Sequence, residues 1–270
     1  MKKTVFIIVA VLLVIAFSVS AFMVVNYVKE SKEQEKMRNE LAEAMAQAAT
    51  QPVTEATEAA TEPVVEETEE TTAPTEVTEA PMLAEMVPIY ELNEDTVGYI
   101  EIPGTNLKNP VMQTPDDPNY YLKRDFNRNS SDWGAVYAWG EADLNEPSDN
   151  ITLFGHTMKD GSMFACLHNY TEKHYWEDNK LIFFNTLTEY HTYKIFAVFK
   201  QSANIGNFAY HQFVDAANAD EFNEFVATCK AQAFYDTGIT PVYGDKLILL
   251  STCEYTLDNG RLVVCAVRIS

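Results

Sequence analysis

The sequence is poor in cysteine and in basic residues, and both shortages argue against whole classes of protein. Its four cysteines, at positions 166, 229, 253 and 265, never form a Cys-x-x-Cys pair, so a structural zinc site is not expected. A disulfide framework is not expected either, because the folded part is long enough to bury its own core, although two of the four could still pair. With 19 basic against 40 acidic residues, the net charge is −21. That charge argues against a nucleic-acid partner, since phosphate binding needs a basic face.

Near the N-terminus the chain lacks charge altogether. Residues 4–28 form an uncharged run of 25 residues, which as a helix would be about 37 Å long and would cross a bilayer. A cleaved signal peptide is the alternative, but the run is longer than the apolar region of a typical signal. Lys2 and Lys3 predict a cytoplasmic N-terminus, although basic residues also follow the run, from Lys29 to Arg38. We expect a single-pass anchor in the cell membrane, with the rest of the chain outside the cell.

Two segments without aromatic residues follow the anchor. Residues 29–49 contain no Gly or Pro and many strong helix formers, which predicts a juxtamembrane helix. Residues 50–85 are rich in Thr, Ala and Pro, with ten Glu and no Lys or Arg. Such a composition buries too little apolar surface to offset the entropy of ordering. It predicts a disordered stalk that would reach roughly 100 Å when fully extended.

The remainder, residues 86–270, has the pattern of a folded domain and a net charge of only −12, from 25 acidic and 13 basic residues. Short apolar and β-branched runs between turn signals predict eight strands, at 96–104, 110–113, 133–140, 150–156, 180–186, 192–200, 246–253 and 261–269. Residues 161–170, with Ser162 as N-cap, and residues 215–234 are the two predicted helices. Eight strands with few helices predict one β-barrel or sandwich.

The last two predicted strands bring together residues with chemical use. The first ends at Cys253, a loop with an Asn-Gly turn signal follows, and the second begins at Arg261. If these strands are antiparallel neighbours, the two side chains lie side by side at one rim of the sheet. A permanent cation beside sulfur can stabilise a thiolate, or the oxyanion formed when sulfur attacks a carbonyl.

A cysteine nucleophile needs a proton-transfer partner, and His156 fits that role best. It directly follows the apolar run ITLFG, at 151–155, and has Gly155 and Gly161 on its two sides, so it also stands at a strand end. The other histidines read as surface residues, or in one case as part of the helix 161–170; they are His168, His174, His191 and His211. Taken singly, a strand-end histidine or a cysteine is more often structural. Together with Arg261, the two form a candidate catalytic set.

Three stretches of the sequence resemble the sortases, cysteine transpeptidases of the Gram-positive cell surface. LSTC followed by Arg261 is similar to the family's TLxTC and arginine signature, with Leu249-Leu250 in place of Thr-Leu. LFGHTMKDGSMF resembles the histidine segment of class B, and TVGYIEIPGTNLKNPVMQTPDDPNYYLKRDF the start of the barrel. The helix 215–234 lies where class B sortases carry an extra helix. The resemblance covers residues 92–269 and implies an eight-stranded sortase barrel.

The resemblance also implies a reaction. Cys253 would attack the threonine carbonyl of a C-terminal sorting signal, Arg261 would bind the substrate backbone and oxyanion, and His156 would shuttle the proton. The partners implied are secreted proteins with that signal and a lipid-linked peptidoglycan precursor whose amine takes the acyl group. Ser251 shares a face with Cys253 and Leu122 matches a groove position, so both are candidate substrate-binding residues, although Leu122 reads equally well as core. The loop 201–212 is expected to add substrate contacts.

Other functions and sites remain open at this point. No metal or other cofactor is expected, because no Asp- and Asn-rich calcium loop is present. A membrane-tethered adhesin explains the anchor and stalk, but not the three candidate catalytic residues. A pilus-building sortase usually has a second apolar segment after the barrel, whereas this sequence stops at Ser270. Cysteine L,D-transpeptidases and wall endopeptidases have other patterns around the cysteine. Cys166, Cys229 and Cys265 read as core residues.

Overall fold

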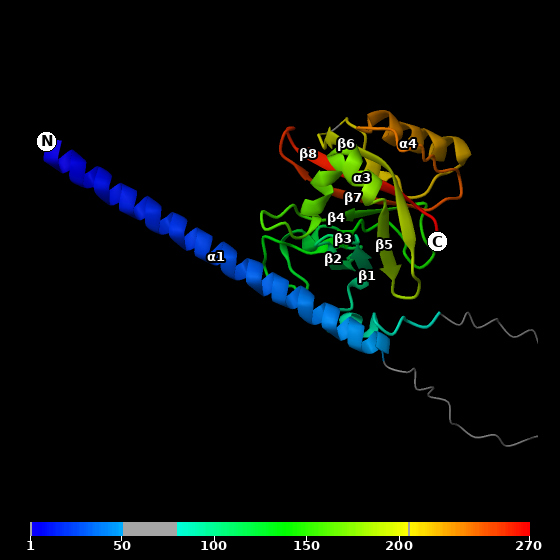
Figure 1. The fold of residues 1–270 in the computed structure, drawn as a ribbon, viewed down its shortest axis with the longest axis horizontal. Helices are drawn as coiled ribbons and strands as arrows, with labels where there is room; N and C mark the ends of the chain where they lie inside the picture. Colours follow the sequence, from blue (N-terminus) through cyan, green and yellow to red (C-terminus); the bar gives the residue numbers. More distant parts are fainter. Residues whose placement is uncertain (1, 51–79, 205) are drawn as a thin grey trace, which may run out of the picture.

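The computed structural model describes residues 2–50, 80–204 and 206–270, and its centre is a closed barrel of eight strands (Figure 1). The strands follow each other around the barrel in the order β1-β2-β3-β4-β7-β8-β6-β5. Their bounds are β1 Thr96–Glu101, β2 Lys108–Met112, β3 Val136–Ala138, β4 Asn150–Phe154, β5 Leu181–Thr186, β6 Thr192–Ser202, β7 Leu247–Glu254 and β8 Gly260–Arg268. The pairs β2–β3 and β4–β7 are parallel, and the others are antiparallel. The prediction of an eight-stranded barrel is confirmed.

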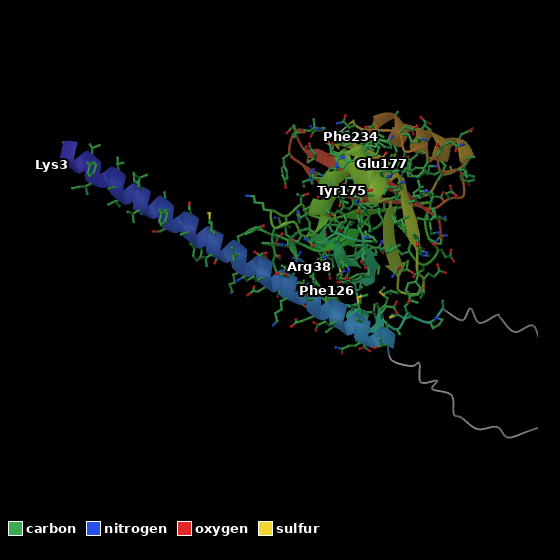
Figure 2. The ribbon with its side chains drawn as sticks, in the orientation of Figure 1. Lys3, Arg38, Phe126, Tyr175, Glu177 and Phe234 are labelled. Atoms are coloured by element: carbon green, nitrogen blue, oxygen red, sulfur yellow. The ribbon has the colours of Figure 1, made fainter. Side chains whose placement is uncertain are left out.

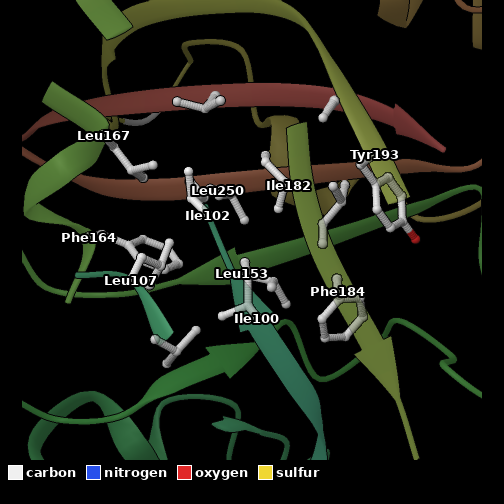
Figure 3. Close-up of a cluster of buried hydrophobic side chains, with 14 of the residues drawn as sticks. Ile100, Ile102, Leu107, Leu153, Phe164, Leu167, Ile182, Phe184, Tyr193 and Leu250 are labelled. Carbon is white, nitrogen blue, oxygen red and sulfur yellow. The ribbon is translucent and has the colours of Figure 1, made fainter. Parts of the chain in front are cut away.

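Alternating side chains of the strands contribute to three apolar clusters, the third of which lies where α1 (Lys2–Thr50) and α2 (Val87–Leu92) meet β1, β2 and β3. Inside the barrel, apolar residues from opposite walls pack together, among them Ile100, Leu153, Ile182 and Leu250 (Figure 3). On the outside, β6, β7 and β8 present a second apolar face, which the helix α4 (Ala219–Gln232) covers. Because strand side chains alternate between faces, Cys253 lies on this outer face with Leu249 and Ser251.

The predicted helices differ from the observed ones at their ends. The helix α4 begins only at Ala219, because the Asn218 side chain accepts hydrogen bonds from two backbone N–H groups of its first turn. The stretch predicted as a helix at 161–170 is the 3₁₀ helix η2 (Phe164–Thr171). Ser162 does not cap it: its hydroxyl donates to Asp160, and Met163 precedes the helix with a φ of 55°. The short elements α2 (Val87–Leu92), η1 (Tyr120–Lys123), α3 (Lys173–Asp178) and η3 (Tyr210–Gln212) complete the fold.

The N-terminal helix α1 (Lys2–Thr50) has two halves with different surroundings. Its first half is apolar, exposed, and long enough to cross a membrane, which makes it a candidate membrane span. Its second half packs along the barrel (Figure 1). The rings of Tyr27 and Trp133 lie 4.9 Å apart, the Ser31 hydroxyl donates to Asp160 at 2.6 Å, and Leu41 is buried. Figure 2 shows Arg38 where α1 meets the barrel and Lys3 at the far end of the helix.

The described residues on both sides of segment 51–79 pack on the same body. Leu41 near the end of α1 belongs to the same apolar cluster as Leu83, whose N–H donates to the Leu187 carbonyl at 2.7 Å. Residues 82–85 of the predicted stalk are therefore attached to the barrel. Residues 51–79 of the predicted stalk lie outside the described residues, so their disorder remains a prediction.

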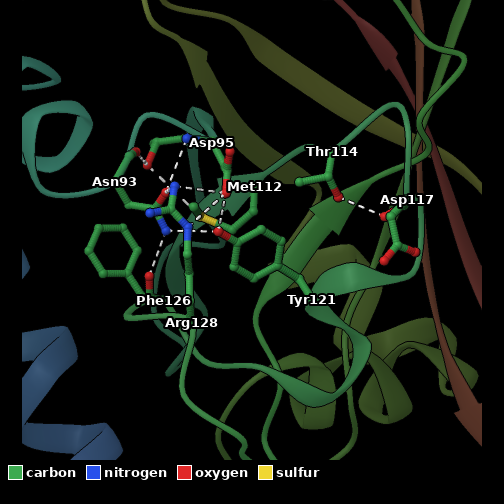
Figure 4. A network of polar contacts seen from close by, with 9 residues as sticks. Asn93, Asp95, Met112, Thr114, Asp117, Tyr121, Phe126 and Arg128 are labelled. Atoms are coloured by element: carbon green, nitrogen blue, oxygen red, sulfur yellow. Dashed lines mark hydrogen bonds and ion pairs between the residues drawn. The ribbon is translucent and has the colours of Figure 1, made fainter.

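A polar network anchors η1, which forms one wall of the groove described below (Figure 4). The Tyr121 hydroxyl donates to Asp95 at 2.5 Å and accepts from the Asn93 side chain at 2.8 Å. The Arg128 guanidinium donates to both Asp95 and Asn93. Burial, followed by the hydrogen bond to Asp95, raises the pKa of Tyr121 to about 12, so its hydroxyl stays a donor. The network thereby fixes the residue that follows, Leu122.

Candidate active site

Cys253 and Arg261 are paired across two antiparallel strands. Cys253 lies near the end of β7, Arg261 lies near the start of β8, and the two stand opposite each other in the strand register. Both are half-buried. The register therefore places the two side chains side by side on one face of the sheet, as expected from the sequence, and the Arg261 guanidinium donates to the Gly260 carbonyl at 2.9 Å.

His156 reaches the same place through a parallel pair of strands. In the parallel β4–β7 register, Phe154 lies beside Ser251. His156 is two residues beyond Phe154, and Cys253 is two residues beyond Ser251. The same register therefore places His156 next to Cys253. Its Nε2 atom lies 2.7 Å from the carbonyl oxygen of Leu122. A carbonyl oxygen only accepts, so Nε2 carries a proton in this arrangement and Nδ1 is left for the groove.

The three residues line one groove with a volume of about 320 Å³. Its walls come from η1, β3, β4, β7 and the β6–β7 connection, and are largely apolar and aromatic; they include Tyr137, Trp139, Phe154, Tyr210 and His211. Leu122 also lines the groove and is 40% exposed, so it is not a core residue. Ser251 lines it as well, and its hydroxyl lies 2.7 Å from the hydroxyl of Tyr210. The structure thus brings all five predicted site residues to one groove.

Arg261 is the one cationic side chain among the described residues that line this groove. Burial raises the pKa of Tyr137 to about 12 although Arg261 acts in the opposite direction, and burial also raises the pKa of Tyr210. Both phenols therefore stay neutral at physiological pH. A single permanent cation in an apolar groove suits an uncharged, extended peptide on which negative charge develops at one point.

The sequence reading missed His211, which was expected at the surface. Its ring packs edge-on against Trp139 at 5.0 Å, between centroids, and contacts Phe154 and Tyr210 at longer range. It belongs to the loop 201–212, for which substrate contacts were expected only collectively. The polar and tyrosine-rich sequence around it gives no periodic signal, because η3 is only three residues long. Its role in the groove follows from tertiary packing alone.

Burial lowers the pKa of His211, and the nearby Arg261 adds to that effect while Glu141 opposes it. The unfolded chain binds the proton near the ordinary pKa of about 6.5, so lowering the pH below that value favours unfolding. We expect the free energy of unfolding to fall between pH 7.5 and 5.5, and to fall less in His211→Phe. Urea denaturation at the two pH values measures this. The exposed His174 serves as control: if His174→Phe weakens the pH dependence as much, burial of His211 is not its cause.

Gly134 allows η1 and His156 to approach closely. Its φ is +60°, and an added Cβ would lie 2.8 Å from the carbonyl oxygens of Tyr121 and Leu122 and 3.1 Å from the His156 ring. We expect Gly134→Ala to lower the free energy of unfolding by about 1–2 kcal/mol for the positive φ and by about 1–3 kcal/mol more for the overlap. Gly238 has a similar φ of +72° with nothing within 4 Å. Gly238→Ala therefore isolates the backbone cost, and equal losses in urea denaturation would contradict the close approach.

Within residues 2–50, 80–204 and 206–270, no group of three or more His, Cys, Asp and Glu side chains could hold a metal ion. The expectation that the reaction needs no cofactor remains a prediction.

A closed β-barrel that carries cysteine, histidine and arginine on one groove is the architecture of a barrel-type cysteine transpeptidase. The model of the sortase domain matches residues 100–269. Sortase B of Listeria monocytogenes is 29% identical over 184 residues, which cover 67% of this chain and 72% of that protein. Sortase B of Staphylococcus aureus is 27% identical over 178 residues, or 65% and 71% of the two chains.

Solved structures agree with this result. A Staphylococcus aureus sortase B–substrate complex superposes with a TM-score of 0.70 at 22% identity, over 90% of this chain and 97% of that one. Sortase B from B. anthracis gives a TM-score of 0.63 at 26% identity, over 71% and 90% of the two chains. The chain belongs to the sortase family and is a class B sortase, as the sequence resemblance predicted.

Proposed function

We propose that this sortase cleaves a C-terminal sorting signal after threonine and transfers the protein to an amine of a lipid-linked peptidoglycan precursor. The observation that carries the proposal is the meeting of Cys253, Arg261 and His156 in one apolar groove. These side chains supply a nucleophile, an anion stabiliser and a proton shuttle. An extended peptide bound in this groove would place a carbonyl beside the sulfur.

The reaction has two halves. The Cys253 thiol passes its proton to His156 as its sulfur attacks the threonine carbonyl, and the oxyanion that forms is stabilised by Arg261. His156 gives its proton to the departing amine, which leaves a thioacyl enzyme. The acceptor amine then attacks the thioester, His156 takes a proton from it, and the sulfur departs. Leu122 and Ser251 would contact the sorting signal from opposite walls.

Two observations support the partners. Sortase B has been solved as a substrate complex and in complex with triglycine. A free glycine amine has the chemistry of the proposed acceptor.

Sortases are cell-surface enzymes. We assign residues 4–28 of α1 as a single membrane span, with the N-terminus in the cytoplasm. Residues 29–49 are then the helix that continues from the span, and residues 86–270 are the extracellular catalytic domain.

The proposal is tested by trapping the intermediate. Full-length protein in detergent micelles is incubated with quenched fluorescent peptides of the form x-Pro-x-Thr-x, with and without triglycine. Mass spectrometry should find the peptide, cleaved after threonine, on Cys253, and the triglycine conjugate when the amine is present. A folded protein that forms neither species with any peptide would leave the adhesin alternative in its place.

A further inference from the structure

Beside the groove, which Thr252 also lines, hydrogen bonds connect the two strand ends that carry the cysteine and the histidine. The hydroxyl of Thr252, the residue before Cys253, donates to the carbonyl of Gly155 at 2.7 Å and lies 2.9 Å from the Thr157 hydroxyl. Gly155 and Thr157 are the two neighbours of His156. One hydroxyl beside the nucleophile is therefore bonded to both sides of the histidine.

A fourth group extends this chain into the 3₁₀ helix η2. The Nε2 atom of His168 lies 3.0 Å from the Thr157 hydroxyl oxygen. The helix that carries His168 is itself fixed to the histidine segment, because the N–H of Phe164 donates to the His156 carbonyl at 2.9 Å. An added Cβ on Gly155 would lie 2.8 Å from the Phe164 ring. This part of the structure is closely packed and leaves little room for other arrangements.

Counting protons fixes the direction of every bond in the chain. A carbonyl only accepts, so the single proton of the Thr252 hydroxyl goes to Gly155. The bond between the two threonines must then use the proton of Thr157. With that proton engaged, Thr157 can only accept from His168, whose Nε2 must carry a proton. Neutral His168 is therefore the Nε2–H tautomer, and protonation of its Nδ1 would leave the chain intact.

Loss of the His168 N–H, the first donor of the chain, would affect the later bonds made by Thr157 and Thr252. Thr252 is almost fully buried, and Thr157 and His168 are half-buried, so water does not readily replace a missing partner. Without the N–H of His168, the Thr157 hydroxyl can turn toward another acceptor and release Thr252. The residues on both sides of His156 are then no longer held by hydrogen bonds at a fixed distance from Cys253.

We propose that His168 is a positioning residue, which acts through Thr157 and Thr252 to fix the spacing between His156 and Cys253. The inference rests on the proposed function, since that spacing matters only if the two residues react together. His168 and Thr157 are absent from the described residues that line the groove. Their loss should therefore lower kcat and leave the KM for the peptide unchanged, because substrate contacts stay in place.

Two variants of His168 separate donation from packing. His168→Leu removes the donor, whereas His168→Gln keeps an N–H donor at a similar distance from the backbone. In peptide cleavage by the full chain in micelles, we expect kcat to fall about 10- to 100-fold in His168→Leu, because small misplacements of reacting groups have effects of that size. His168→Gln should stay close to the wild type. Full activity in a folded His168→Leu, or equal losses in both variants, would overturn the proposal.

Thr252→Val and Thr252→Ser give an independent pair if His168→Leu does not fold. The serine keeps the hydroxyl and should retain kcat, whereas the valine should lose it. Nitrogen-15 NMR of the histidine rings should show the Nε2–H tautomer for His168 in the wild type, and the Nδ1–H tautomer would overturn the proposal. This measurement needs no turnover. A wild type that shows the tautomer but forms no thioacyl adduct would therefore contradict the proposed function and leave the hydrogen-bonded chain standing.

Discussion

Replacing Cys253 with alanine should lower kcat/KM for peptide cleavage by at least about 10⁴-fold, because Cys253 is the one thiol among the described residues that line the groove. The position of the sulfur is set by the β7–β8 register, which places it opposite Arg261. Removing the sulfur leaves that register and the groove walls unchanged. Binding of the peptide to Cys253→Ala should therefore persist, and fluorescence anisotropy with a labelled peptide measures it beside the cleavage assay.

Cys166 provides the matched control for this prediction. It is half-buried like Cys253, but burial raises its pKa to about 11, which keeps the thiol protonated and unreactive near neutral pH. Cys166→Ala should therefore keep the cleavage activity. If the two alanine variants lose activity equally, the loss reflects folding, and if neither loses activity, Cys253 is not the nucleophile.

Replacing His156 should have the second largest effect, a loss of about 10²- to 10⁴-fold in kcat, as is typical for removal of a general acid–base group. His156→Gln is the informative change, because its side-chain amide can still donate to the Leu122 carbonyl that now accepts from Nε2. It keeps the position and removes the proton transfer. We expect His156→Gln to be nearly as inactive as His156→Ala.

The exposed His174 controls for a general effect of losing a histidine, and His174→Gln should leave kcat unchanged. Recovery of most of the activity in His156→Gln would show that the histidine acts by its hydrogen bond to Leu122 and not by proton transfer. A peptide with a better leaving group separates the two roles further, since it should rescue His156→Ala only if protonation of the amine limits the rate.

Local patterns in the sequence were sufficient to predict eight strands in a barrel or sandwich and the pairing of Cys253 with Arg261, and the sortase resemblance then favoured the barrel. The eight strands are short apolar runs bounded by turns, and an antiparallel pair with a tight connection has few possible registers. The start of η2 was not predictable, because it depends on the left-handed backbone of Met163 and on where the Ser162 hydroxyl donates. Both features depend on contacts with neighbouring segments and not on the intrinsic preferences of Ser162 and Met163.

Contacts between distant parts of the chain explain what the sequence could not reveal. His211 faces the groove because Trp139, some 70 residues earlier, packs against it. The docking of α1 rests on pairs such as Glu30 with Ser131, which are 101 residues apart. Met37, Leu41 and Met45 recur at four-residue spacing and pack against the barrel, which is a signal in the sequence that the prediction did not use. The relay of hydroxyls through Thr157 and Thr252 is invisible in the sequence, since each residue alone reads as an ordinary strand-end threonine.

The packing of α1 on the barrel determines which part of the chain sets the distance between the membrane and the groove. The described residues on both sides of segment 51–79 pack on the barrel. Lengthening that segment would therefore enlarge a loop and would not change the distance from the membrane to the groove. With residues 4–28 in a bilayer, the distance from the lipid to the groove would instead be set by the number of helical residues between the lipid and the first contact with the barrel. Tyr27 and Trp133 already touch at that boundary. With the span inserted, this contact would hold the barrel and its groove close to the lipid surface.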